Sequence, residues 1–263
     1  MTVTLPDETK EFYCRAIETL REAKIPFMVG GAYAFGVYTG IHRHTKDLDF
    51  FIRPVDVERT LQCFGRDGYT TEVTFPHWLA KVHRGEDFLD LIFRAGNGLC
   101  EVDDSWFDRA REDEVLGCRA LLTPAEEMLW MKSFIMERER FDGADVMHII
   151  HRRAEKIDWQ HLVRRFDENW RVLLSHLVLF GYVYPAERHR IPSSVMTELL
   201  QWAQEEISAS APHERTCRGT LLSREQYLHD IRELGYADAR LTSASHMSAE
   251  DVANWTAAIE QRD

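Results

Sequence analysis

The stretch VGGAYAFGVYTGIHRHTKDLDFFIRP, residues 29–54, contains two glycines after an apolar run and then Asp47 and Asp49, one residue apart. Because residues two apart in a strand share a face, we expect both aspartates to point one way while Leu48 and Phe50 enter the core. Two neighbouring carboxylates repel each other, and a divalent cation removes that repulsion. Carboxylate oxygens suit Mg²⁺ or Mn²⁺, so the stretch predicts a half-buried strand with a metal site on one face.

Composition narrows the class of protein. The chain has 263 residues, 44% of them hydrophobic and 29% charged, as in an ordinary globular protein with a sizeable core. The formal charge of −12 argues against a non-specific grip on nucleic acid, which needs a cationic surface. Five scattered cysteines without a CxxC pair indicate free thiols in a reducing compartment. No signal peptide or membrane span is expected, so we predict a cytoplasmic protein with no membrane partner.

Hydrophobic periodicity predicts a mixed α+β fold. Strand-like and helix-like segments alternate in residues 1–120, with three strands expected between residues 69 and 94. Residues 121–263 are predicted to form a mainly helical second domain, apart from an expected loop at 203–220. Capping boxes at Thr123–Glu126 and Ser223–Gln226 predict two helix starts there, the second helix ending near Gly235.

A third aspartate and the glycine pair extend the expected site. Asp90 sits inside the apolar run DFLDLIF, and a carboxylate in such a strand needs a partner. If the two strands are neighbours, Asp90 completes a carboxylate triad that could hold the paired metals of phosphoryl transfer. Gly30 and Gly31 precede a predicted helix, whose N-terminal N–H groups could bind a phosphate. The alternative is an edge strand with exposed charges and a buried ion pair at Asp90.

The order V-G-G, T-K-D-L-D-F-F and then L-D-L resembles the nucleotidyltransferase superfamily, whose fold is shared with polymerase beta. The resemblance covers residues 25–95 and is strongest with small bacterial members related to antitoxins and antibiotic-modifying enzymes. It implies a catalytic domain at 1–120. One departure is the gap of 15 residues between Gly31 and Asp47, which is long for the pattern.

Carried over by position, the resemblance implies a role for each motif residue. Asp47 and Asp49 would bind Mg²⁺ or Mn²⁺, and Asp90 would help bind metal or activate the attacking hydroxyl. Gly30 and Gly31 would hold the phosphates of a nucleoside triphosphate, with ATP the expected co-substrate. We therefore expect Gly31→Ala to lower nucleotide affinity more than stability.

Basic residues near these motifs have two interpretations each. Arg43 and Lys46 could neutralise the triphosphate or belong to a solvated loop. Lys132 could reach the phosphates, whereas ordinary helix surface pairing, such as Arg138 with Asp142, explains the same stretch.

A histidine pair on a helix is the other metal candidate. His148 and His151 are three residues apart, but no third ligand lies nearby in the sequence, so a structural role is favoured.

Two functions of different class fit the sequence. The first is a metal-dependent nucleotidyltransferase that moves a nucleoside monophosphate from an NTP to an acceptor hydroxyl on a small molecule, RNA or protein. The second is a nucleotidyltransferase-fold scaffold, antitoxin-like, that binds a partner protein without turnover. The acceptor and the oligomeric state are not indicated by the sequence.

Overall fold

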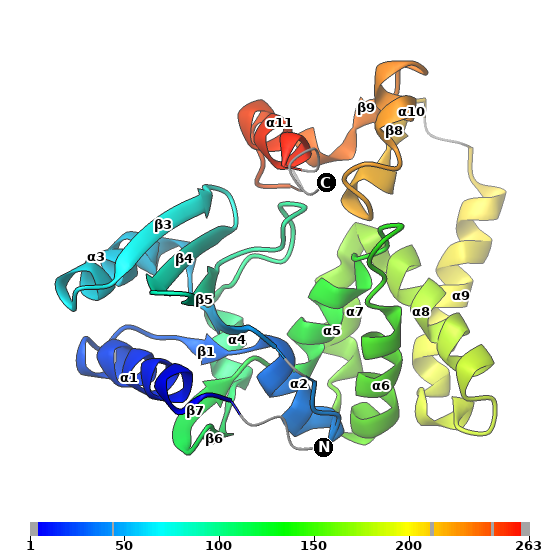
Figure 1. Ribbon diagram of the computed structural model, residues 1–263. Helices are drawn as coiled ribbons and strands as arrows, with labels where there is room; N and C mark the ends of the chain where they lie inside the picture. Colours follow the sequence, from blue (N-terminus) through cyan, green and yellow to red (C-terminus); the bar gives the residue numbers. More distant parts are fainter. Residues whose placement is uncertain (1–4, 44, 211–212, 243–244, 259–263) are drawn as a thin grey trace. The chain divides into compact units, whose positions relative to one another are not determined.

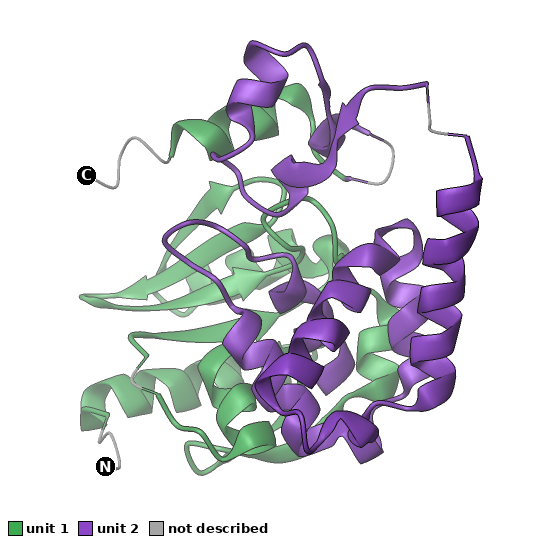
Figure 2. Ribbon diagram, turned by 90° about the vertical axis from the view of Figure 1, so that its right-hand side faces the viewer, with its two compact units in different colours: residues 1–124, 246–263 green, residues 125–245 purple. Residues whose placement is uncertain are grey.

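The protein forms a mixed α+β structure, as the sequence predicts (Figure 1). The computed structural model describes four stretches of the chain: residues 5–43, 45–210, 213–242 and 245–258. The chain divides into two compact units, of which unit 1 comprises residues 1–124 and 246–263 and unit 2 comprises residues 125–245 (Figure 2). None of the described helices combines the length and the apolarity needed to cross a bilayer.

Unit 1 contains a sheet and five α-helices among its described residues. Its helices are α1 (Asp7–Glu22), α2 (Gly31–Thr39), α3 (Val57–Arg66), α4 (Asp104–Arg109) and α11 (Ala249–Ala257). Its strands are β1 (Met28–Val29), β2 (Asp47–Phe51), β3 (Thr70–Phe75), β4 (Leu79–Arg84), β5 (Asp87–Ile92), β6 (Arg111–Val115) and β7 (Cys118–Leu122).

The sheet of unit 1 has seven strands in the order β3-β4-β5-β2-β1-β7-β6. The neighbours β2–β5 and β1–β7 are parallel, and the other pairs are antiparallel. The three strands predicted between residues 69 and 94 are confirmed as β3, β4 and β5. The β6–β7 hairpin was not predicted; it turns at Leu116 and Gly117, whose φ angles of +58° and +88° suit a tight two-residue turn.

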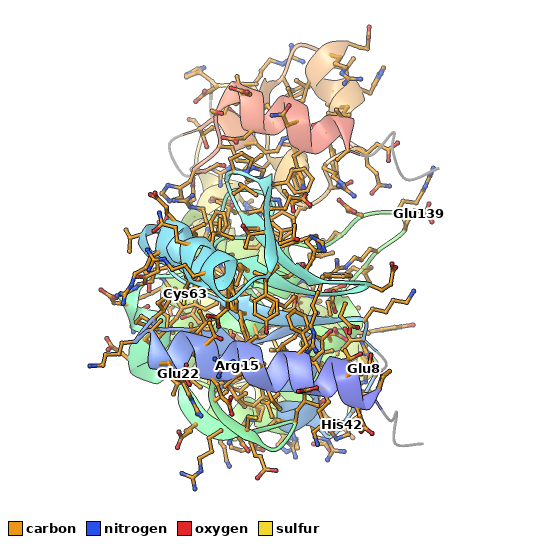
Figure 3. All side chains as sticks on the ribbon, turned by 60° about the vertical axis from the view of Figure 1, so that its left-hand side comes forward. Glu8, Arg15, Glu22, His42, Cys63 and Glu139 are labelled. Atoms are coloured by element: carbon orange, nitrogen blue, oxygen red, sulfur yellow. The ribbon has the colours of Figure 1, made fainter. Side chains whose placement is uncertain are left out.

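Helix α1 shows how the helices of unit 1 bury one face. Phe12, Ile17 and Leu20 recur at helical spacing and are fully buried. Arg15 and Glu22 lie on its opposite, exposed side, where they form an ion pair of 3.4 Å (Figure 3). Helix α1 therefore has the one-sided burial of an amphipathic helix packed on a core.

The C-terminal segment belongs to unit 1, although the sequence groups it with the helical half. The backbone N–H of His246 donates to the Gly98 carbonyl at 3.1 Å. The indole of Trp255 lies so close to Gly96 that a Cβ there would be 2.8 Å from its ring. Asp251 lies 3.6 Å from the buried imidazole of His77. These contacts attach α11 to the loops beside the sheet.

Unit 2 is mainly helical, as expected. Its α-helices are α5 (Ala125–Ser133), α6 (Gly143–Arg153), α7 (Trp159–Phe166), α8 (Trp170–Val183), α9 (Ser193–Ser208) and α10 (Leu228–Arg232). A short parallel pair, β8 (Thr216–Cys217) and β9 (Ala237–Asp238), follows α9 along the chain. Beside it the buried guanidinium of Arg240 forms an ion pair of 2.6 Å with Asp238.

Three local predictions in this half are corrected by the structure. Helix α5 starts where expected, but the capping box is wrong, because Glu126 accepts the N–H of Asp158 and the Thr123 hydroxyl has no hydrogen-bond partner among the described residues. The Ser223 hydroxyl does accept the N–H of Gln226, at 3.2 Å, yet only the short α10 follows. The loop expected at 203–220 is wrong at its start, since α9 continues to residue 208.

Candidate active site

The strand pair β2–β5 places the aspartates. These strands are adjacent and parallel, and their register sets Asp49 opposite Asp90. Leu48 and Phe50 are fully buried on the other face of β2, so the alternation expected from the sequence is present. A single face of the sheet therefore carries all three carboxylates.

The carboxylates of Asp47, Asp49 and Asp90 form one cluster. One oxygen from each lies within 4.8 Å of the other two, and no other such group of possible metal ligands occurs among the described residues. All three side chains are half-buried, which leaves a route for a ligand. Three hard oxygen donors at this spacing fit Mg²⁺ or Mn²⁺. The predicted proximity is present, and metal binding stays a prediction.

Electrostatics at the cluster follow from burial and crowding. Burial raises the pKa of the Asp90 carboxyl, and the nearby charge of Asp47 adds to the increase, while the Lys81 ammonium opposes it. Burial also raises the pKa of Tyr33, on α2, to about 12, with the charges of Asp47 and Asp49 contributing. The phenol of Tyr33 therefore stays protonated beside the carboxylates at neutral pH.

The glycine pair is in direct contact with this cluster. The N–H of Gly30 donates to the backbone carbonyl of Asp49 at 3.0 Å, and α2 begins at the next residue. Gly31 has φ +53°, and a Cβ there would lie 1.7 Å from Asp49 Oδ2. Glycine is needed at position 31 because its backbone is left-handed and the Asp49 carboxylate fills the space of a side chain. This geometry argues against the expectation that Gly31→Ala lowers nucleotide affinity more than stability, because an alanine at position 31 is strained with or without a ligand.

The basic candidates are in different places. Lys46 is next to Asp47, and its carbonyl accepts a hydrogen bond of 3.2 Å from the Tyr13 hydroxyl. The guanidinium of Arg43 lies over the Phe35 ring, 4.8 Å from its centroid. Both belong to unit 1, as the carboxylates do, and their contact with a triphosphate stays a prediction.

Lys132 is in unit 2. Its ammonium bridges Asp142 and Asp145 at 2.7 and 2.8 Å, and both carboxylates are largely buried. The suggested pair of Arg138 with Asp142 is wrong, because Arg140 contacts Asp142 instead. An ion-pair role accounts for the surroundings of Lys132.

The histidine pair on α6 shows no metal site. His151 packs against the ring of Tyr184, with centroids 4.6 Å apart. His148 and His151 belong to no group of three possible ligands within the described part of the chain. The structural interpretation of this pair agrees with these contacts.

Lys81 was missed by the sequence analysis. It is opposite Asp90 on the neighbouring strand β4, and its Nζ lies 2.6 Å from Asp90 Oδ1. The sequence does contain a signal for this pair. A two-residue turn at Gly85 and Glu86 pairs Arg84 with Asp87, and counting back by three residues on each strand sets Lys81 opposite Asp90.

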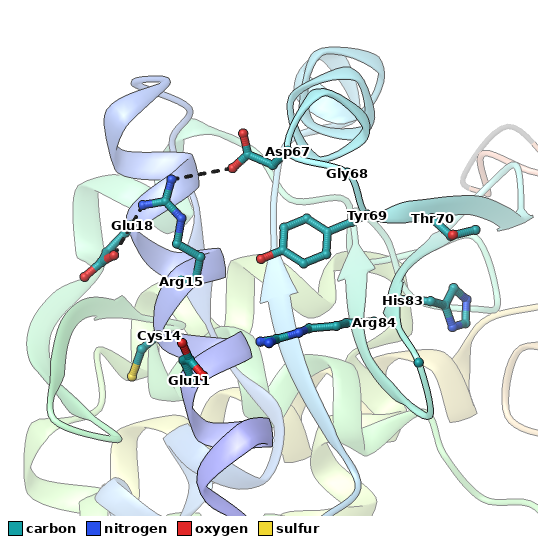
Figure 4. Close-up of a pocket in the computed structure, with 11 residues that line it drawn as sticks. Glu11, Cys14, Arg15, Glu18, Asp67, Gly68, Tyr69, Thr70, His83 and Arg84 are labelled. Atoms are coloured by element: carbon teal, nitrogen blue, oxygen red, sulfur yellow. Dashed lines mark hydrogen bonds and ion pairs between the residues drawn. The ribbon is translucent and has the colours of Figure 1, made fainter.

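A separate depression lies elsewhere on unit 1 (Figure 4). It has a volume of about 640 Å³ and is lined by α1, the turn before β3 and the end of β4. Within it, Arg15 forms an ion pair of 3.8 Å with Asp67. No carboxylate of the cluster lines it, so this depression is distinct from the candidate site.

The mixed sheet, the glycine pair at the start of α2 and the carboxylate cluster together define a nucleotidyltransferase-like protein. The chain belongs to the family described as uncharacterised nucleotidyltransferases, whose sequence profile matches residues 13–179. That match includes the triad, the glycine pair and α5 to α7 of unit 2. No curated protein matches the chain.

Several solved structures are similar at low identity. The lincomycin-bound lincosamide antibiotic adenylyltransferase LnuA is 17% identical, with a TM-score of 0.39, and covers 54% of this chain and 95% of its own. An antigenic nucleotidyltransferase-like protein from Paracoccidioides brasiliensis is 18% identical, with a TM-score of 0.45 and coverages of 73% and 93%. ANT(2")-Ia in complex with adenylyl-2"-tobramycin is 14% identical, with a TM-score of 0.36 and coverages of 77% and 99%. Similarity at this level does not identify a substrate.

Proposed function

We propose that the protein transfers a nucleoside monophosphate group from a nucleoside triphosphate, with ATP the expected donor, to the hydroxyl of an acceptor. The observation that carries this proposal is the cluster of Asp47, Asp49 and Asp90 beside the first turn of α2. Membership of the nucleotidyltransferase family supports it. The acceptor is a small molecule, an RNA or a protein.

The carboxylates supply the cation site. Asp47 and Asp49 would hold Mg²⁺ or Mn²⁺, and Asp90 would share in this or accept the proton of the attacking hydroxyl. The bound cation would neutralise phosphate charge and lower the pKa of the acceptor hydroxyl. Burial raises the pKa of the Asp90 carboxyl above its ordinary value, which is the direction that favours acceptance of a proton.

The start of α2 supplies the phosphate site. The first intrahelical hydrogen bond runs from the N–H of Ala34 to the Gly30 carbonyl at 3.1 Å, so the N–H groups of residues 31–33 precede the helical ladder. These donors and the positive end of the helix dipole favour an anion. Arg43 and Lys46, on the loop that leads to β2, would add positive charge around the triphosphate.

Thermal unfolding with metal and nucleotide tests the proposal. Mg²⁺ or Mn²⁺ with ATP should raise the melting temperature of the wild-type protein through ligand linkage. Asp47→Asn and Asp49→Asn should abolish that increase, because each removes a charged cation ligand. The protein should stay folded, because asparagine is close to aspartate in size. An exposed substitution such as Glu86→Gln, in the β4–β5 turn, serves as the matched loss of one negative charge.

Two outcomes would count against the proposal. A double variant, Asp47→Asn with Asp49→Asn, that binds metal–nucleotide as tightly as the wild type would show that the cluster is not the site. Tight nucleotide binding without transfer of labelled nucleotide to antibiotics, tRNA or proteins would favour the non-catalytic scaffold instead.

A further inference from the structure

A row of charged residues crosses one face of the sheet in unit 1. The strand registers align Glu72 of β3, Lys81 of β4, Asp90 of β5 and Asp49 of β2 side by side. Lys81 therefore stands between two acidic neighbours, one on each adjacent strand. If the Lys81 ammonium contacts Asp90, Lys81 belongs to the candidate site. If it contacts Glu72, Lys81 belongs to the edge of the sheet.

The ammonium of Lys81 contacts the candidate site. Its Nζ lies 2.6 Å from Asp90 Oδ1, and it lies over the ring of Phe88 at 4.2 Å from the centroid. The carboxylate of Glu72 lies instead 3.6 Å from the His83 imidazole and is about half exposed. The Lys81 and Asp90 side chains are only 21% and 14% exposed. This ion pair is therefore partly desolvated, and the attraction between its charges is less screened by water than that of a surface pair.

The contact has two physical consequences for the triad. One positive charge lies beside three carboxylates, so the repulsion among Asp47, Asp49 and Asp90 is partly offset before any ligand binds. One oxygen of Asp90 is also committed to a hydrogen bond, which fixes the orientation of that carboxylate. Neither consequence requires a bound metal ion or nucleotide.

We propose that Lys81 is a positioning residue of the nucleotidyl-transfer site, which holds Asp90 in place and acts as a resident cation that weakens divalent-metal binding in the absence of nucleotide. This inference rests on the proposed function, because it assumes that the triad binds metal. Its consequence is that the metal enters chiefly together with the triphosphate, whose negative charge outweighs the repulsion from the ammonium. Lys81 thus makes the loading of the site depend on nucleotide.

Substitution of Lys81 separates charge from shape. Lys81→Gln keeps a hydrogen-bond donor for Asp90 but removes the charge, and Lys81→Arg keeps both. A unit charge about 6 Å from a divalent cation in a water-like medium changes the affinity about tenfold. We therefore expect Lys81→Gln to bind Mn²⁺ about tenfold more tightly than the wild type at low salt, and Lys81→Arg to stay within about twofold of it. Lys10→Met, at an exposed position on α1, removes one positive charge as Lys81→Gln does, and it should leave the Mn²⁺ affinity unchanged.

The assay is Mn²⁺ titration followed by electron paramagnetic resonance, without nucleotide and then with a non-hydrolysable ATP analogue. With the analogue, the difference in Mn²⁺ affinity between Lys81→Gln and the wild type should shrink, since the triphosphate supplies negative charge in every variant. Asp90→Asn should reduce the effect of Lys81→Gln, because the carboxylate that holds the ammonium beside the cluster is then neutral, and only the through-space repulsion of a less firmly held ammonium remains. Circular dichroism melting confirms that each variant is folded, and Lys81→Met serves if Lys81→Gln does not fold.

The outcomes distinguish this inference from the proposed function. Equal Mn²⁺ binding by the wild type and by Asp49→Asn would overturn the metal site itself. Mn²⁺ binding that needs Asp49 but is unchanged or weakened in Lys81→Gln would overturn the role of Lys81 alone and leave it a structural ion pair.

Discussion

Replacement of Gly31 by alanine should destabilise the protein through two separable costs. The first is backbone strain, because φ at Gly31 is +53° and an L-residue in the left-handed region costs about 1–2 kcal/mol. The second is overlap, because the new Cβ would lie 1.7 Å from Asp49 Oδ2. Asp49 must then leave its rotamer, which adds about 0.5–1.5 kcal/mol. We expect a total loss of unfolding free energy of about 1.5–3.5 kcal/mol.

A control glycine isolates the first cost. Gly40 ends α2 with φ +74°, and nothing within 4 Å would meet its Cβ. Gly40→Ala should therefore show only the strain, about 1–2 kcal/mol. Urea unfolding of both variants measures the difference, and a double-mutant cycle with Asp49→Ala should recover the overlap term.

One result would refute this reasoning. Gly31→Ala would lower the free energy of unfolding by no more than Gly40→Ala does, and the double-mutant cycle would show no coupling energy with Asp49→Ala. Nucleotide affinity of Gly31→Ala should fall as well, because a displaced Asp49 would no longer help to hold the cation that neutralises the triphosphate. Affinity and stability would then fall together.

Three further outcomes are expected. Asp90→Asn should abolish nucleotidyl transfer while most nucleotide binding remains, as measured with labelled NTP; retained turnover would remove Asp90 from the chemistry. Lys132→Met should lower the free energy of unfolding in urea by about 3 kcal/mol, because two largely buried carboxylates lose their shared cation; a fall in NTP affinity without this loss would instead make Lys132 a phosphate ligand. Burial lowers the pKa of His176 below its ordinary value of 6.5, so its stabilising contribution is full above that pH and declines as the pH falls toward the folded-state pKa. His176→Gln should therefore flatten the fall in unfolding free energy between pH 7.5 and 5, by at most about 1.4 kcal/mol per pH unit, and an unchanged slope would contradict it.

The sequence predicted those parts of the site that follow from strand alternation. Apolar neighbours on both sides of Asp49 and Asp90, and Leu48 after Asp47, leave one arrangement in which each strand buries its apolar face. That arrangement brings the carboxylates together because β2 and β5 are adjacent, a pairing that the sequence did not determine. The start of α2 was predicted from Gly30 and Gly31, because small residues before a helix are a local signal.

What could not be predicted depends on contacts distant in sequence. The left-handed backbone at Gly31 and the Asp49 carboxylate that lies beside it are both features of the tertiary structure, which the local sequence does not determine. The strand β6, REDEV, is largely polar and resembles a surface helix or loop until β7 pairs with it. The return of α11 to unit 1 depends on the fit of Trp255 against Gly96, and no periodicity reports such a contact.

The β4–β5 turn is an exposed two-residue loop, and loops of this kind are usually where related chains gain or lose residues freely. Here the freedom is restricted, because Gly85 and Glu86 alone set the register between the two strands. One inserted residue that slipped β4 by one position would turn Lys81 toward the apolar face and bring Val82 beside Asp90. We therefore expect engineered insertions to be tolerated far better in the β6–β7 hairpin than in this turn. The length of the β4–β5 turn is in this sense a part of the candidate site, although neither of its residues reaches the carboxylates.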